Sequence, residues 1–264
     1  MRTTDPGAHA RPHAIVLSFD NLGEASELER GTWDHQVALG HHASVTMALP
    51  RLLDELDALG LSATFFVEAL NCELYPQALL EIAGRGHELG VHGWRHEAWG
   101  QLSPEREGDL LARAARAFRA LGLPTRAFRP PGGESTVRTQ PLLRELGYQW
   151  WSPARGSDGG GDRPATIPFD WELVDAYHLM NRFDYVRVRL GDSRAPLQPA
   201  VAAERLCAVL ATGSGTQVLI LHPFLMLDSR WWEGVRGVLA LVAQLTAERR
   251  AWVGPGGELA QATR

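Results

Sequence analysis

One repeated pattern restricts the fold of this chain: a segment with helical spacing ends at a glycine, and a short apolar run follows. Gly60, Gly86, Gly122 and Gly147 each stand at such a junction. Glycine suits the left-handed position that ends many helices, and short continuous apolar runs are typical of strands buried on both faces. Repeated units of this kind predict an α/β protein with a parallel sheet, open or closed into a barrel.

The pattern accounts for a single domain. The stretch over residues 152–168, which contains three consecutive glycines, interrupts it, and this composition predicts a loop over the mouth of a site. We therefore expect three parts: a flexible N-terminus over residues 1–13, one catalytic domain over residues 14–254 and a polar C-terminal tail over residues 255–264.

The composition excludes several classes of protein. All 26 basic residues are Arg, and 31 acidic residues bring the net charge to −5, so we expect neither nucleic acid nor a membrane as a partner. The absence of Lys excludes Schiff-base enzymes and the phosphate loop of P-loop nucleotide-binding proteins. The sequence shows no apolar signal region and no apolar stretch long enough to span a bilayer, so we expect a cytoplasmic location.

A histidine pair is the first candidate functional motif. His92 and His96 are four residues apart, a spacing that places two side chains on one side of a helical turn. Two neutral imidazoles are a good half-site for Zn²⁺. No Glu follows His92, as it would in the His-Glu-x-x-His motif of zinc proteases, so another residue must supply the catalytic base.

Polar residues also follow several of the apolar runs. Asp20, His92, Arg129 and His222 each stand where such a run ends. In parallel α/β folds the carboxyl ends of the strands meet at one edge, where active sites form. We therefore expect these four side chains to share a site.

Five motifs follow one another along residues 14 to about 225: Ser18-Phe19-Asp20-Asn21, His92-Gly93-Trp94-Arg95-His96, Arg129-Pro130-Pro131-Gly132, Asp170-Trp171 and Leu219-Ile220-Leu221-His222. In these motifs and their order the chain resembles the polysaccharide deacetylase family (the NodB-homology domain). The resemblance implies an α/β fold, a distorted (β/α) barrel of about seven parallel strands, and an amide hydrolase that uses a metal.

The resemblance implies a divalent metal, with Zn²⁺ the leading candidate, held by His92 and His96. The family's third ligand is an Asp, and Asn21 stands at that position. An amide oxygen can bind a metal but brings no charge, so we expect weaker binding, and Asp20 or Glu24 are alternative third ligands.

The resemblance also implies an acid–base pair. Asp20 would be the general base that takes a proton from water, and Arg129 would keep it ionised and oriented. His222 would protonate the leaving amine, with Asp170 tuning the imidazole. Asp175 is a second candidate for that carboxylate.

We expect a cytoplasmic hydrolase of amide C–N bonds that removes an N-acetyl or formyl group from a small-molecule amide, such as an N-acetylated amino sugar or a metabolite that carries one. A long first loop followed by Pro50-Arg51-Leu52-Leu53 also resembles the allantoinase-like, cyclic-imide-cleaving branch, some members of which work without a metal. Ring opening of a cyclic amide or imide is therefore an alternative. A carbohydrate-binding protein without catalysis is another, although binding alone needs no acid–base pair.

Overall fold

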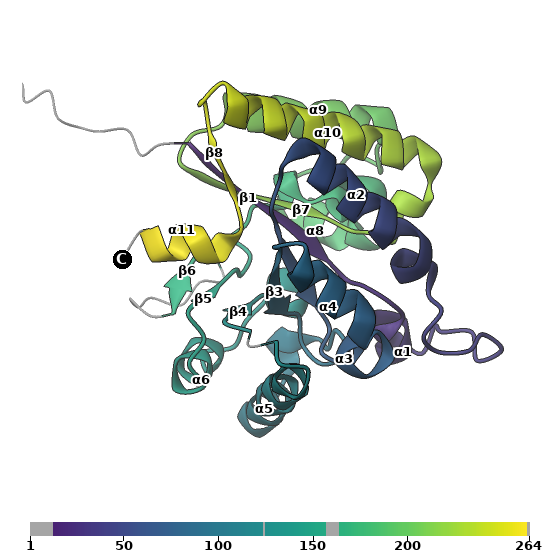
Figure 1. Cartoon of the computed structure of the whole chain (residues 1–264), viewed down its shortest axis with the longest axis vertical. Coiled ribbons are helices and arrows are strands. Elements are labelled where there is room, and N and C mark those ends of the chain that lie inside the picture. Colours follow the sequence, from purple (N-terminus) through teal and green to yellow (C-terminus); the bar gives the residue numbers. More distant parts are fainter. Residues whose placement is uncertain (1–12, 124, 157–163, 263–264) are drawn as a thin grey trace, which may run out of the picture.

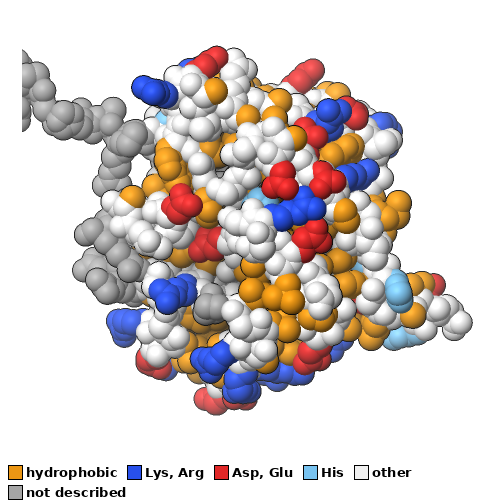
Figure 2. Space-filling view, in the orientation of Figure 1, with side chains coloured by type: hydrophobic (Ala, Val, Ile, Leu, Met, Phe, Trp, Pro, Cys, Tyr) orange, Lys and Arg blue, Asp and Glu red, His pale blue; other side chains and the backbone are white. Residues whose placement is uncertain are grey.

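The computed structural model describes residues 13–123, 125–156 and 164–262. The expected flexible N-terminus, apart from residue 13, and the glycines of the predicted loop lie outside the described residues. No helix among the described residues is long and apolar enough to cross a membrane. Charged side chains of both signs are spread over the face of the molecule shown in Figure 2.

All strands pair in parallel in one sheet, in the order β6-β5-β4-β3-β2-β1-β7, with β8 paired to β1. An isolated parallel bridge between Val174 and Ile220 brings the chain after β6 beside β7, so the sheet curls toward closure. The parallel sheet that the sequence predicted, and the distorted barrel that the family resemblance implied, are confirmed. The strands are β1 (Ala14–Asp20), β2 (Thr64–Val67), β3 (Glu88–Val91), β4 (Ala127–Phe128), β5 (Trp150–Trp151), β6 (Ala165–Thr166), β7 (Thr216–Leu221) and β8 (Trp252–Gly254).

Helices follow most of the strands, and α2, α9 and α10 lie together on one side of the molecule (Figure 1). Gly60 has the left-handed conformation, with a φ of 64°, and its N–H closes the end of the helix before it, as the pattern predicted. The helices are α1 (Ala25–Arg30), α2 (Leu49–Leu59), α3 (Asn71–Leu74), α4 (Pro76–Gly84), α5 (Pro104–Ala120), α6 (Thr139–Glu145), α7 (Asp175–Leu179), α8 (Asp184–Arg189), α9 (Pro199–Thr212), α10 (Ser229–Ala247) and α11 (Gly256–Ala262).

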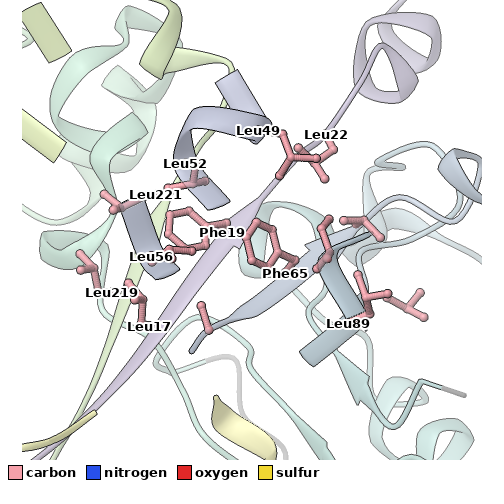
Figure 3. Close-up of a cluster of buried hydrophobic side chains, with 14 of the residues drawn as sticks. Leu17, Phe19, Leu22, Leu49, Leu52, Leu56, Phe65, Leu89, Leu219 and Leu221 are labelled. Atoms are coloured by element: carbon pink, nitrogen blue, oxygen red, sulfur yellow. The ribbon is translucent and has the colours of Figure 1, made fainter. Parts of the chain in front are cut away.

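The main core lies between the sheet and these helices. Leu52 and Leu56 of α2 point toward β1, where Phe19 stacks on Phe65 of β2 with ring centroids 4.8 Å apart (Figure 3). All four side chains are at most 1% exposed. Full burial of each such side chain is worth roughly 1.5–3 kcal/mol, so the helical face and the strands stabilise one another.

The prediction of a polar C-terminal tail over residues 255–264 is in part wrong, because helix α11 occupies most of this range. The backbone N–H of Gly256 donates to the Thr64 hydroxyl at 3.0 Å, and that of Gly257 donates to the Glu88 carboxylate at 3.0 Å. Thr64 and Glu88 begin β2 and β3, so α11 covers the amino ends of the strands. The opposite edge of the sheet is left for the site.

Candidate active site

The carboxyl ends of the strands bring the predicted polar side chains together. Asp20 is the last residue of β1, His92 follows β3, Arg129 follows β4 and His222 follows β7. All four line one cavity of about 680 Å³. This volume lies within the range of small-molecule sites, roughly 300–1,000 Å³.

Asp20 is held by Arg129 on one side and faces a histidine on the other. Nη1 of Arg129 donates to Oδ1 of Asp20 at 2.6 Å and to the Ser18 hydroxyl at 2.9 Å, and Nη2 donates to the Ser152 hydroxyl at 3.0 Å. The other carboxylate oxygen, Oδ2, lies 3.9 Å from Nε2 of His92. The hydrogen bond of Arg129 to Asp20 engages Oδ1, so Oδ2 is not held by the guanidinium.

His92 and His96 meet with ring centroids 5.0 Å apart and planes at 78°. Nδ1 of His92 lies 2.9 Å from the carbonyl oxygen of Arg129, an acceptor, so we assign the proton to Nδ1 and the lone pair to Nε2. Burial lowers the pKa of His92 to about 3 and the pKa of His96 well below its usual value. Both imidazoles are therefore neutral, the form that binds metals.

The expected helical turn between the two histidines is wrong, because residues 92–98 form a loop. Gly93 and His96 both have positive φ, 74° and 72°. The carboxylate of Glu97 accepts the N–H groups of Trp94 and Arg95, each at 3.0 Å, and so closes the loop. A left-handed non-glycine residue is strained, and such strain is common at functional sites.

Asn21 lines the same cavity, and its side chain carries an acceptor that a metal could use. Its side-chain oxygen Oδ1 is buried and has no hydrogen-bond partner among the described residues. A buried unpaired acceptor costs roughly 1–3 kcal/mol, so a ligand for this oxygen would relieve that cost. An amide oxygen and two neutral imidazoles fit a divalent metal.

The other two candidates for the third ligand differ in position. Glu24 does not line the cavity, because its carboxylate accepts the Tyr75 hydroxyl at 2.5 Å and the Gly40 N–H at 2.7 Å. Glu24 as a ligand is therefore wrong. Asp20 remains beside His92. The described residues contain no group of three or more His, Cys, Asp and Glu side chains that could hold a metal ion.

Asp175, and not Asp170, is the carboxylate that contacts His222. Oδ1 of Asp175 lies 2.5 Å from Nδ1 of His222, and Oδ2 accepts the His222 backbone N–H at 2.8 Å. Asp170 forms an exposed ion pair with Arg155, at 2.6 and 2.9 Å. The assignment of Asp170 is therefore wrong: α7 begins at Asp175 and carries this residue under β7, whereas Asp170 precedes Trp171 at the surface.

A buried acid beside the site was missed. Glu68 directly follows β2 and accepts the Leu22 N–H at 3.3 Å, while its second oxygen has no partner among the described residues. Burial raises the pKa of Glu68 to about 8, and the charges of Asp20 and Glu97 add to this effect. Its place at the end of an apolar run is the same signal that identified Asp20.

We predict that Glu68 makes the free energy of unfolding depend on pH. Because its folded-state pKa of about 8 exceeds the ordinary 4.5, the folded chain holds this proton more tightly. The free energy of unfolding should then fall as pH rises through that interval, by up to several kcal/mol at about 1.4 kcal/mol per pKa unit. Glu68→Gln, neutral at every pH, should flatten this fall in urea unfolding measured across the interval. The exposed Glu73→Gln is the control, and identical slopes for Glu68→Gln and wild type would contradict the assignment.

Comparisons with known proteins show the family of this chain. A family model described as "Polysaccharide deacetylase" matches residues 9–151, more than half of the chain. The chain therefore belongs to the polysaccharide deacetylase family, whose enzymes hydrolyse amide C–N bonds.

Two curated relatives show how far the sequence similarity extends. Chitin deacetylase 1 of Saccharomyces cerevisiae is 33% identical over 114 residues, which cover 42% of this chain and 34% of that protein. The peptidoglycan deacetylase of Helicobacter pylori is 28% identical over 105 residues, 39% of this chain and 36% of that protein. The chain thus spans about a third of the length of these relatives.

Solved structures match over nearly the whole chain. A Mycobacterium smegmatis protein assigned to the polysaccharide deacetylases superposes with a TM-score of 0.77 at 26% identity, covering 98% of this chain and 92% of that one. Puue allantoinase superposes with a TM-score of 0.70 over 96% of this chain and 90% of that one. At 15% identity the second match shows the fold alone.

Proposed function

We propose that this chain removes the acetyl group from an N-acetylated amino sugar, or from a small metabolite that carries one, by hydrolysis of the amide bond. The observation that carries the proposal is the pairing of Asp20 with Arg129 and of His222 with Asp175 in one cavity. In each pair the partner residue, Arg129 or Asp175, binds one atom of the catalytic side chain and holds that side chain in place. The other atom, Oδ2 of Asp20 or Nε2 of His222, is left to react with the substrate.

Asp20 acts on the water. With Oδ1 held by Arg129, Oδ2 is the oxygen available to take a proton as the water oxygen attacks the acetyl carbon. The buried guanidinium keeps the carboxylate in place throughout, so little reorganisation is needed during the reaction.

A divalent metal, most simply Zn²⁺, would be held by His92, His96 and the Asn21 amide oxygen. When bound, it supplies Lewis-acid polarisation of the amide carbonyl and lowers the pKa of water. The hydrogen bond from His92 to the Arg129 carbonyl orients that ring, as is usual for histidines that bind metals.

His222 acts on the leaving group. Its Nδ1–H donates to Asp175, which holds the ring in place and leaves Nε2–H as the donor to the leaving group. As the C–N bond breaks, this proton passes to the departing nitrogen, and the products are acetate and a free amine.

The proposal is tested by incubating the Zn²⁺-loaded protein with a panel of N-acetylated amino sugars and cyclic imides. We expect release of acetate and a mass loss of one acetyl group from at least one sugar, and no release after chelation of the metal. A cyclic imide that instead gains one water would show the ring-opening alternative. Sugar binding without any product would show the binding-protein alternative.

A substitution at Asn21 tests the proposed third ligand without an activity assay. Asn21→Asp should tighten Zn²⁺ binding by about tenfold or more, because an anionic oxygen replaces a neutral one. The left-handed backbone at this residue, with a φ of 62°, suits Asp as it suits Asn. Competition with a chelator measures the dissociation constant, with the exposed Asn181→Asp as control. Equal constants for Asn21→Asp and wild type would show that Asn21 does not bind the metal.

A further inference from the structure

The wall of the catalytic cavity carries two arginines that form no ion pair with the described part of the chain. Arg30 ends α1, and Arg182 lies in the turn before α8. Neither forms an ion pair with any residue that the structure describes, although both line a cavity in a chain of net charge −5.

The acidic residues of the same wall are already engaged. The Glu29 carboxylate lies 3.8 Å from Arg95, that of Glu134 lies 3.0 Å from Arg189, and that of Asp20 lies 2.6 Å from Arg129. The remaining one, Glu97, accepts two backbone N–H groups. Ion pairs among the described residues therefore engage Arg129 and Arg189 of this wall and leave Arg30 and Arg182 without a carboxylate partner.

The surroundings of Arg182 hold its guanidinium in place without neutralising it. Its guanidinium carbon lies 5.5 Å from the ring centre of Phe183 and 5.6 Å from that of Phe224. Desolvation, and then repulsion from Arg30, lower the pKa of Arg182 to about 10, while attraction by Glu27 is smaller. The carboxylate of Glu27 itself lies 3.7 Å from His42.

Most N–H groups of the Arg30 guanidinium are not engaged by described side chains. Its one hydrogen bond to a described side chain runs from Nη2 to the Ser26 hydroxyl at 3.1 Å. Two neighbouring guanidinium groups that repel each other are stabilised by an anion placed between them. Their planar donor forks match the oxygens of a carboxylate or a phosphate.

We propose that Arg30 and Arg182 bind an acidic substituent of the substrate, so that the preferred substrate is an N-acetylated amino sugar carrying a carboxylate or a phosphate. The inference rests on the proposed function for the amide, and adds the acidic group. Because both arginines line the cavity that holds Asp20 and His222, one sugar can engage both ends of the site.

The first experiment compares kcat/KM for N-acetylglucosamine, N-acetylglucosamine 6-phosphate and N-acetylmuramic acid, which are neutral, phosphorylated and carboxylated. At low salt, at least one acidic sugar should exceed the neutral sugar by roughly tenfold to hundredfold, as charge-assisted hydrogen bonds allow. The larger of the two values identifies phosphate or carboxylate as the group bound. The advantage should shrink as salt is added.

Variants connect the preference to these residues. Arg182→Gln and Arg30→Gln should each lower the ratio of kcat/KM for the acidic sugar to that for the neutral sugar by roughly tenfold. The exposed Arg116→Gln, on α5 outside the cavity, removes the same charge and should keep the ratio of the wild type.

Calorimetric binding to Asp20→Asn separates this inference from the proposed function, since binding needs no turnover. Tighter binding of an acidic sugar that is lost in the double variant with Arg182→Gln supports the inference, even if no amide is cleaved by the wild type. Equal dissociation constants for neutral and acidic sugars, or a preference that survives Arg182→Gln and Arg30→Gln, would overturn it, even if acetate is released.

Discussion

Replacing Asp20 by Asn is expected to lower kcat for acetate release by roughly 10²–10⁴, the usual contribution of a general base. The amide keeps the shape of the side chain but cannot take a proton from water. KM should change much less, because Oδ1 is turned toward Arg129 and, in the proposed mechanism, Oδ2 takes a proton from water and does not bind the sugar. Steady-state kinetics on the Zn²⁺-loaded protein measure both constants.

The same substitution has a cost in stability that must be measured separately. Arg129 is 1% exposed, and removing the charge of Asp20 leaves its guanidinium buried without a counter-ion. Breaking a buried pair in this way costs roughly 3–5 kcal/mol, so Asp20→Asn should also unfold at lower urea. Asp54→Asn, on the exposed surface of α2, is the control. An Asp20→Asn protein that is folded, binds Zn²⁺ and keeps the wild-type kcat would remove Asp20 from the mechanism.

The fold was predictable because its signals are local. Each short apolar run is buried in the parallel sheet, and Gly60 ends its helix in the conformation that the pattern required. Polar residues directly after such runs also identified one side of the site, since the carboxyl ends of parallel strands meet at a single edge. Glu68 follows the same rule and was available to the same argument.

The parts that were not predictable depend on contacts distant in sequence. Asp170 and Asp175 are five residues apart, and only the packing of α7 against β7 determines which one reaches His222. The loop that brings His92 and His96 together depends on Glu97 and on two left-handed residues, neither of which the histidine spacing reveals. Helix α11 docks through hydrogen bonds to β2 and β3, far from it in sequence.

The sequence also could not show that Arg30 and Arg182 form no ion pair with the described residues. Acidic residues stand close to both arginines in the sequence: Glu29 directly precedes Arg30, and Asp184 follows Arg182 by two positions. In the folded chain Glu29 turns to Arg95 instead. Which arginines of the cavity remain without an ion pair is therefore decided by contacts that form only in the folded chain.

Replacing His222 by Ala is expected to lower kcat by roughly 10²–10⁴, because the leaving amine then departs without a proton. Amides are poor substrates without this proton, whereas an activated ester with a weakly basic leaving group needs it far less. His222→Ala should therefore lose much more activity on an N-acetylated sugar than on 4-nitrophenyl acetate. Equal losses on both substrates would show that His222 does not act as the general acid.

Asp175→Asn should reproduce most of this loss, because it replaces the carboxylate that accepts from Nδ1 and from the backbone N–H of His222 and so orients the ring. Asp170→Asn is the matched control. It removes the same charge five residues away, from an exposed pair with Arg155, and should leave kcat unchanged. The two variants distinguish two assignments. The distance of 2.5 Å from Asp175 to His222 predicts that the loss occurs in Asp175→Asn, whereas the Asp-Trp motif predicts that it occurs in Asp170→Asn. A loss confined to Asp170→Asn would therefore refute the acid–base arrangement derived from the fold.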